Sequence, residues 1–269
     1  MSRPIIRRHE LAVEAYGVPI AISVSDSDLL AHVPRVVPPQ SKPCRLESVG
    51  QRFGLIKENG VGYRVVVGDT VHEACTDLEL AVGTLDAFVR SHIAINAPNR
   101  IFVHAGVVSY RGRAIVLPGT SFSGKTTLAV ALIQAGAAYY SEEYAVFDEF
   151  GLVHPYPKPF SIRDHDHIVV DRPVEAFGGS PGSEPVPVGL VVLTSYTPGA
   201  RWNPRRATAG EGVLGLLQNT IPARERPTEA LRAARRAIAA ALVLEGERGE
   251  AGEAAMALLD AVASAGSIA

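Results

Sequence analysis

The feature that most constrains this chain is a glycine-rich stretch near its middle, Gly119-Thr-Ser-Phe-Ser-Gly-Lys-Thr126, which matches the pattern GxxxxGK[ST]. An apolar run, residues 113–119, leads into it, and residues 124–135 lead out with helical periodicity and end at Gly136. This order predicts a strand, a tight loop and a helix closed by a glycine C-cap. A glycine-rich turn without any ligand is the alternative, but such a turn requires neither the lysine nor the following hydroxyl.

The chemistry of this stretch predicts a phosphate-binding loop. Backbone N–H groups of the loop and the helix N-terminus supply positive potential. We expect Lys125 to reach the β- and γ-phosphates and the Thr126 hydroxyl to ligate Mg²⁺. The residues expected to contact the nucleotide are Gly119, Thr120, Ser121, Phe122, Ser123, Gly124, Lys125, Thr126 and Thr127.

Two adjacent glutamates, Glu142 and Glu143, follow the apolar residues "AAYY" and lie sixteen to eighteen positions beyond Lys125 and Thr126. One helix and one short strand fill that interval, so we expect the strand to end beside the loop. Adjacent side chains of an extended chain point to opposite faces, which predicts that one glutamate faces the phosphates and the other turns away. The alternative is a solvated acidic turn.

The pattern of expected strands and helices changes near residue 99, which divides the chain into two parts. Residues 1–99 contain short strand and turn patterns and one helix pattern at 76–97, capped by Thr76 or Asp77, with Leu80 on its apolar face. Strand and helix patterns alternate in residues 100–269, which is typical of an α/β core. We therefore expect a β-rich N-terminal lobe, 1–99, and an α/β domain, 100–269.

Several further elements are predicted in the second part. Residues 190–196 form a continuous apolar run, as in a buried central strand. An amphipathic helix is expected at 228–242, with Leu231 facing inward, and an alanine-rich helix at 251–264. Asp148 and Glu149 are expected in a hairpin turn with Gly151.

Composition limits the classes of function. The 269 residues are 47% hydrophobic and 20% charged, with a net charge of −2, so no basic excess favours nucleic acid as a partner. Cys44 and Cys75 stand outside any metal-ligand spacing, which favours two free thiols. No apolar run approaches the length of a membrane span. We expect a cytoplasmic protein without a membrane partner.

Residues 104–148 resemble the C-terminal catalytic domain of HPr kinase/phosphorylase. They are similar also to the short HPr-kinase-like proteins of bacterial operons, some of them associated with peptide natural products. The resemblance covers His104, the loop, the helix to Gly136, and the position of the family's Asp-Asp pair, which here holds Glu142 and Glu143.

This sequence departs from the family pattern in three places. The glutamates are one methylene longer than the family's aspartates. The loop continues as Lys125-Thr126-Thr127 in place of Lys-Ser-Glu. The later signature Glu-Ile-Arg-Gly has its nearest counterpart in "FSIRD", which keeps Arg163 but has Ser161 at the position of the family's metal-binding glutamate.

The resemblance implies a PEP-carboxykinase-like P-loop nucleotide-binding core. It implies an ATP- and Mg²⁺-dependent kinase that phosphorylates a serine-like hydroxyl of a peptide, a protein or a small molecule. One of Glu142 and Glu143 would take the substrate proton and the other would help to hold Mg²⁺, with Lys125, His104 and Arg163 completing the catalytic set. A satisfied buried histidine is the alternative for His104.

Two alternatives remain open at this point. A nucleotide-binding or slowly hydrolysing regulatory protein without kinase activity would also fit the glutamate substitutions. A homo-oligomer is also open, because the parent family is commonly oligomeric.

Overall fold

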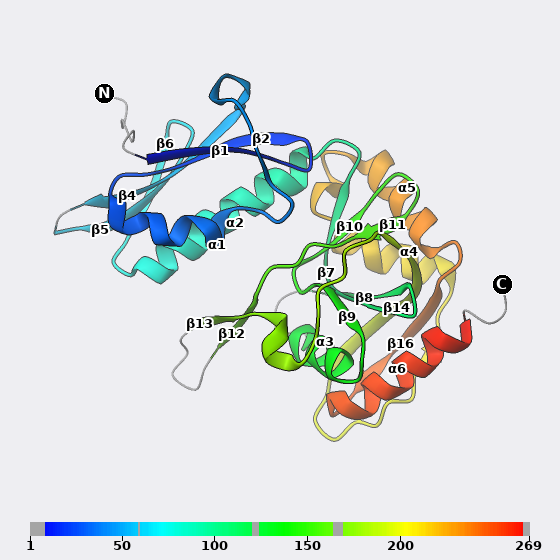
Figure 1. Cartoon of the computed structure of the whole chain (residues 1–269). Helices are drawn as coiled ribbons and strands as arrows, with labels where there is room; N and C mark the ends of the chain where they lie inside the picture. The colour runs from blue at the N-terminus through cyan, green and yellow to red at the C-terminus, as the bar shows by residue number, and fades with distance from the viewer. Residues whose placement is uncertain (1–8, 59, 120–123, 164–168, 266–269) are drawn as a thin grey trace. The chain divides into compact units, whose positions relative to one another are not determined.

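The computed structural model describes residues 9–58, 60–119, 124–163 and 169–265. The chain divides into two compact units, Met1–Pro98 and Asn99–Ala269, and each is considered by itself. Both combine sheets and helices, so the protein is of the mixed α/β class (Figure 1). No helix of the described residues is long and apolar enough to cross a membrane.

The first unit is a six-stranded sheet in the order β3-β1-β2-β4-β5-β6, in which only the β2–β4 pair is parallel. Its strands are β1 (His9–Ala15), β2 (Val18–Val24), β3 (Lys42–Pro43), β4 (Gln51–Glu58), β5 (Gly62–Val67) and β6 (Thr70–Cys75). Its helices are α1 (Val33–Val36), α2 (Leu78–Asn96) and the 3₁₀ turns η1 (Ser27–His32) and η2 (Leu46–Ser48).

Helix α2 forms where the sequence predicts it and is capped by Asp77, whose carboxylate accepts a hydrogen bond of 2.8 Å from the N–H of Leu80. Its buried face contains Val82, Leu85 and Val89. Leu80 was expected on that face, but its side chain is 61% exposed. The apolar face is narrower than the sequence suggests, because Leu80 is two positions from Val82, about 200° around the helix, and so lies on the opposite side.

The second unit is built on an eight-stranded mixed sheet in the order β11-β10-β7-β8-β14-β16-β15, with β9 also paired to β7. Its strands are β7 (Ile101–Tyr110), β8 (Arg113–Pro118), β9 (Ala138–Ser141), β10 (Tyr144–Phe147), β11 (Leu152–His154), β14 (Val186–Tyr196), β15 (Arg205–Arg206) and β16 (Leu242–Arg248). A separate two-stranded ladder joins β12 (Phe160–Arg163) to β13 (Val169–Arg172).

Helices cover both faces of this sheet (Figure 1). One core contains residues of α3 and α6, and the other contains residues of α4 and α5. The helices are α3 (Lys125–Gln134), α4 (Ala209–Gln218), α5 (Pro227–Ile238) and α6 (Ala251–Ala265), with the 3₁₀ turns η3 (Val174–Phe177) and η4 (Ile221–Ala223).

The three central strands β8, β14 and β16 run parallel, so their carboxyl ends meet at one edge of the sheet. Pro118, Tyr196 and Arg248 are the last residues of these strands. In sheets of this kind, ligands bind in the crevice outside the carboxyl ends of the strands. The β8–α3 connection, which holds the predicted phosphate loop, begins at this edge.

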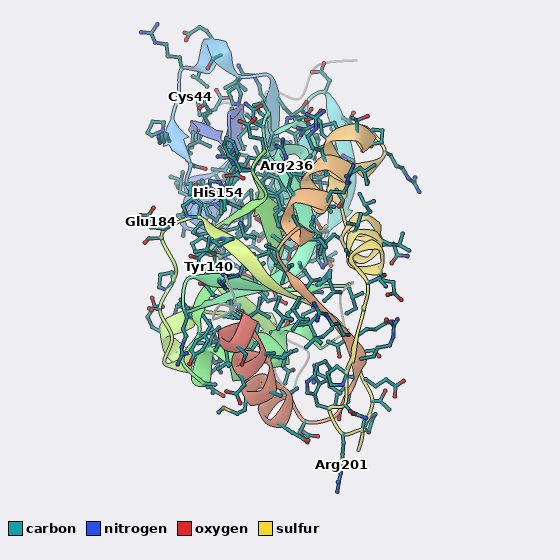
Figure 2. The ribbon with its side chains drawn as sticks, turned by 90° about the vertical axis from the view of Figure 1, so that its right-hand side faces the viewer. Cys44, Tyr140, His154, Glu184, Arg201 and Arg236 are labelled. Atoms are coloured by element: carbon teal, nitrogen blue, oxygen red, sulfur yellow. The ribbon has the colours of Figure 1, made fainter. Side chains whose placement is uncertain are left out.

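Two connections are fixed by side chains. The carboxylate of Asp148 accepts hydrogen bonds of 2.9 Å from the N–H groups of Phe150 and Leu152, and closes the predicted hairpin turn at Gly151. The Tyr140 hydroxyl donates a hydrogen bond of 2.7 Å to the carbonyl of Glu184 and so ties the segment 177–189 to β9 (Figure 2).

Candidate functional site

The two ends of the predicted phosphate loop are held together by Lys125. Its ammonium donates a hydrogen bond of 2.8 Å to the carbonyl of Gly119, and only 8% of the residue is exposed. Gly119 in turn donates its N–H to the carbonyl of His104 on the neighbouring strand β7, at 3.3 Å. The loop residues between these ends, 120–123, lie outside the described part of the chain, so Thr120, Ser121, Phe122 and Ser123 remain predictions.

Glu142 and Glu143 occupy the connection between β9 and β10. The buried Ser141 hydroxyl accepts hydrogen bonds from the N–H groups of Glu143 and Tyr144, at 3.0 and 2.8 Å, and fixes this turn. The side chain of Glu142 reaches the loop, because the Thr126 hydroxyl donates a hydrogen bond of 2.5 Å to its Oε1.

Glu143 takes the other direction. Its Oε1 lies 3.5 Å from Nδ1 of His104, which stands opposite Tyr144 on β7. The backbone of His104 is also engaged, since its N–H donates to the carbonyl of Asn219 at 2.7 Å. The two adjacent side chains of this turn therefore take different directions, with Glu142 at the loop hydroxyl and Glu143 at the histidine.

Lys125 lies within the electrostatic influence of both glutamates. Burial lowers the pKa of its ammonium below the usual value, while the charges of Glu142 and Glu143 oppose that shift. The structure thus brings together Lys125, Thr126, His104 and the two glutamates, which lie on three different segments of the chain.

Arg163 and Thr127 are the remaining predicted site residues. Arg163 is the last residue of β12, and its side chain lies outside the described part of the structure. Thr127 is on α3 beside Thr126, and it is exposed.

Sequence reasoning missed Arg248, at the carboxyl end of β16. Its guanidinium donates 2.7 Å to the carbonyl of Gly124, the residue that precedes α3. Gly124 adopts φ +81°, and a Cβ atom there would lie 2.3 Å from Nη2 of Arg248. No sequence pattern singles out Arg248, and nothing in the sequence connects position 248 to position 124.

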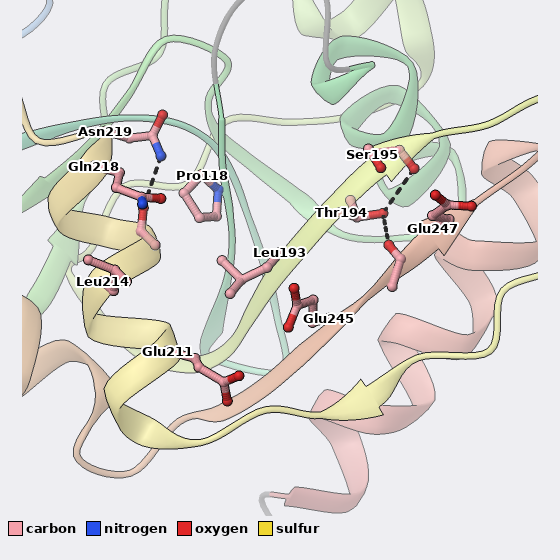
Figure 3. A pocket seen from close by; sticks show the side chains of 12 residues that line it. Pro118, Leu193, Thr194, Ser195, Glu211, Leu214, Gln218, Asn219, Glu245 and Glu247 are labelled. Carbon is pink, nitrogen blue, oxygen red and sulfur yellow. Dashed lines mark hydrogen bonds between the residues drawn. The ribbon is translucent and has the colours of Figure 1, made fainter.

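A cavity of about 560 Å³ opens beside the loop, between α4 and the ends of β14 and β16 (Figure 3). Pro118 and Thr194 line both this cavity and a much smaller one next to Lys125 and Arg248. A volume of this size is in the range of small-molecule sites. The remaining lining residues are Leu193, Ser195, Glu211, Leu214, Gly215, Gln218, Asn219, Glu245, Gly246 and Glu247.

Arg205 partly neutralises two carboxylates that line this cavity, those of Glu211 and Glu245. Arg205 donates to Glu211 at 2.7 Å and contacts Glu245 as well. The Arg205 guanidinium, with Thr208, lowers the pKa of Glu211 to about 2. Arg201, four positions before Arg205, points outward from the second unit (Figure 2).

The oxygen atoms at Thr126 and Glu142 suit Mg²⁺. No group of three His, Cys, Asp or Glu side chains gathers into a metal cluster within the described ranges. Mg²⁺ typically uses one or two protein carboxylates and completes its shell with phosphate and water. A hydroxyl and a carboxylate 2.5 Å apart are consistent with that mode of binding.

No protein-family model matches this chain, and no curated protein is similar enough in sequence to be counted as a relative.

Proposed function

We propose that this protein is an ATP- and Mg²⁺-dependent phosphotransferase with a PEP-carboxykinase-like P-loop core, similar to HPr-kinase-like enzymes, that phosphorylates a serine-like hydroxyl. The observation that carries the proposal is the 2.5 Å hydrogen bond between Thr126 and Glu142. It joins the residue expected to ligate Mg²⁺ to the first of the paired carboxylates, across sixteen positions of sequence.

The contacts of the two glutamates support different roles. Glu142 faces the loop hydroxyl, which suits a group that helps Thr126 to hold Mg²⁺. Glu143 faces His104, with 3.5 Å between its Oε1 and Nδ1 of the histidine, which suits a proton acceptor that the histidine positions. Bound Mg²⁺ would neutralise charge on the β- and γ-phosphates.

In the proposed reaction the acceptor oxygen attacks the γ-phosphorus while the bond to the bridging oxygen of ADP breaks. The hydroxyl proton passes to the Glu143 carboxylate, and the bond electrons leave with ADP. Lys125, held at the mouth of the loop by the Gly119 carbonyl, would stabilise the charge that develops on the phosphoryl oxygens. The acceptor is a peptide, a protein or a small molecule.

The first test is the melting temperature with ATP and Mg²⁺. We expect a rise for the native chain, no rise for Lys125→Ala, and an undiminished rise for Lys57→Ala, which alters an exposed lysine of the first unit. Absence of a rise in the native chain would refute nucleotide binding and, with it, the proposed kinase.

The second test is transfer of labelled γ-phosphate to a degenerate peptide library with one fixed serine. Glu142→Gln and Glu143→Gln are expected to bind ATP and to lose transfer. Binding and slow ATP hydrolysis in the native chain, without transfer to peptides or to a panel of small hydroxyl compounds, would favour the regulatory nucleotide-binding alternative.

A further inference from the structure

Arg248 is a buried cation in the second unit. It ends β16, and 1% of the residue is exposed. Nη2 donates to the carbonyl of Gly124 at 2.7 Å, Nη1 donates to the carbonyl of Gly249 at 3.0 Å, and the ring of Tyr196 lies 5.5 Å from the guanidinium carbon.

In the part of the chain that the structure describes, the charge of Arg248 lacks a direct counter-ion. Among the described residues no carboxylate makes an ion pair with it, and its Nε has no hydrogen-bond partner. Burial lowers the pKa of the guanidinium, and the opposing influences of Tyr196 and Glu250 do not cancel that shift. A guanidinium nevertheless stays charged in proteins, so this site retains a desolvated positive charge.

The same side chain determines the direction of a loop carbonyl. A phosphate loop works when its N–H groups point at the ligand and its carbonyls point elsewhere. The Gly124 carbonyl points to buried Arg248, and Gly124 has the left-handed backbone (φ +81°, ψ +14°) at the start of α3. Only glycine fits there, because any Cβ would collide with the guanidinium.

We propose that Arg248 is a positioning residue of the phosphate loop, whose unpaired charge is balanced by the phosphates of a bound polyphosphate ligand. This inference rests on the proposed function, since it concerns the same loop. A buried cation without a counter-ion is costly in the free protein, and an anion bound on the opposite side of Gly124 offsets that cost. Affinity should therefore increase with the number of phosphates on the ligand.

The test compares dissociation constants for ATP, ADP, AMP and adenosine by calorimetry. Arg248→Gln retains an N–H donor for Gly124 but removes the charge. We expect it to weaken ATP binding about tenfold or more, ADP binding less, and adenosine binding less than about twofold. Arg248→Lys keeps the charge, and its ratio of ATP to adenosine affinity should stay within about threefold of the native ratio.

The matched control is Arg206→Gln, which removes an exposed arginine of β15, the strand paired with β16. It should leave all four constants unchanged. An equal loss for all four ligands, or no loss, in Arg248→Gln would overturn the proposal while leaving nucleotide binding intact. If that variant does not fold, a collapse of the affinity ratio in Arg248→Lys would overturn it. Failure of the native chain to bind ATP would instead refute the proposed function.

Discussion

The Thr126 hydroxyl donates a 2.5 Å hydrogen bond to Oε1 of Glu142. Thr126 lies in the first turn of α3, and Glu142 directly follows β9, the strand after this helix. A hydroxyl that donates to a carboxylate must release that bond when both oxygens turn to a cation. The bond therefore brings together two oxygens that would separate to about 2.9 Å to become neighbouring ligands of one octahedral Mg²⁺.

This pair predicts an effect on metal-dependent binding. Thr126→Ala removes one oxygen and is expected to weaken Mg²⁺-dependent ATP binding on the order of tenfold, while ATP binding in the presence of a chelator changes little. Thr126→Ser retains the hydroxyl and should behave like the native chain. Calorimetric titrations with and without Mg²⁺ measure the difference. Equal losses under both conditions would mean that Thr126 contributes to phosphate binding alone.

A second prediction concerns the contact between Gly124 and Arg248. Gly178 has almost the same backbone angles as Gly124, φ +75° and ψ +13° against φ +81° and ψ +14°, but open space around it. Gly178→Ala should cost about 1 kcal/mol of unfolding free energy through the left-handed backbone alone. Gly124→Ala should cost roughly 1–3 kcal/mol more because its Cβ meets the guanidinium.

Urea unfolding of the two variants measures this difference. Equal costs for Gly124→Ala and Gly178→Ala would show that the guanidinium moves aside easily. In that case the loop carbonyl at position 124 is not fixed by Arg248.

Local patterns predict the elements of this fold well where one signal dominates. The helix expected at 124–135 is α3, Lys125–Gln134, and the continuous apolar run at 190–196 lies in the central strand β14. The helix expected at 228–242 instead ends at Ile238, because β16 starts at Leu242 to pair with β14. Leu231, expected inward, is 43% exposed, since alanines make the close contact of α5 with the sheet.

In the candidate site, too, some contacts could be predicted from the sequence and others could not. The loop and its distance to the glutamates are local in sequence, so the neighbourhood of Thr126 and Glu142 was accessible to reasoning from spacing. The contact between Arg248 and Gly124 spans 124 positions and depends on the parallel pairing of β14 with β16. The pairing of strands that are far apart in sequence produces no periodic pattern in the sequence. The role of Arg248 could therefore not be predicted without the fold.

The cavity beside the loop yields a third prediction, which follows from the proposed function. In-line transfer places the leaving nucleotide opposite the acceptor. The glutamates lie at the β7–β10 side of the loop, and the cavity lies at the β14–β16 side, so the cavity should receive the nucleoside. Leu214→Trp fills part of it and should weaken ATP about tenfold, but leave inorganic triphosphate unchanged.

Leu231→Trp is the control for that variant, because Leu231 is likewise exposed on a helix but lies outside the cavity lining. Competition titrations with ATP and triphosphate separate the two ligands. A Leu214→Trp variant that binds both normally but transfers phosphate slowly would place the acceptor, not the nucleoside, in the cavity.

The last prediction concerns stability against acid. Asp148 is buried, and burial alone would raise the pKa of its carboxyl group. Hydrogen bonds from His154 and from the N–H groups of Leu152 and Phe150 outweigh burial, so the net pKa is lowered. A lowered pKa in the folded state means that the carboxylate stabilises the protein above its unfolded pKa, about 3.9, and that this contribution disappears as pH falls through the folded value.

Asp148→Asn keeps an acceptor for the turn but removes the charge from the 2.9 Å bond with His154. We expect it to lower the unfolding free energy at pH 7 by about 1–3 kcal/mol. The difference from the native chain should shrink steadily below about pH 4, where the native carboxyl also becomes protonated. Urea unfolding at pH 7 and pH 3 measures both effects, with the exposed Asp260→Asn as control. A difference that stays constant between the two pH values would mean that shape, not charge, makes Asp148 stabilising.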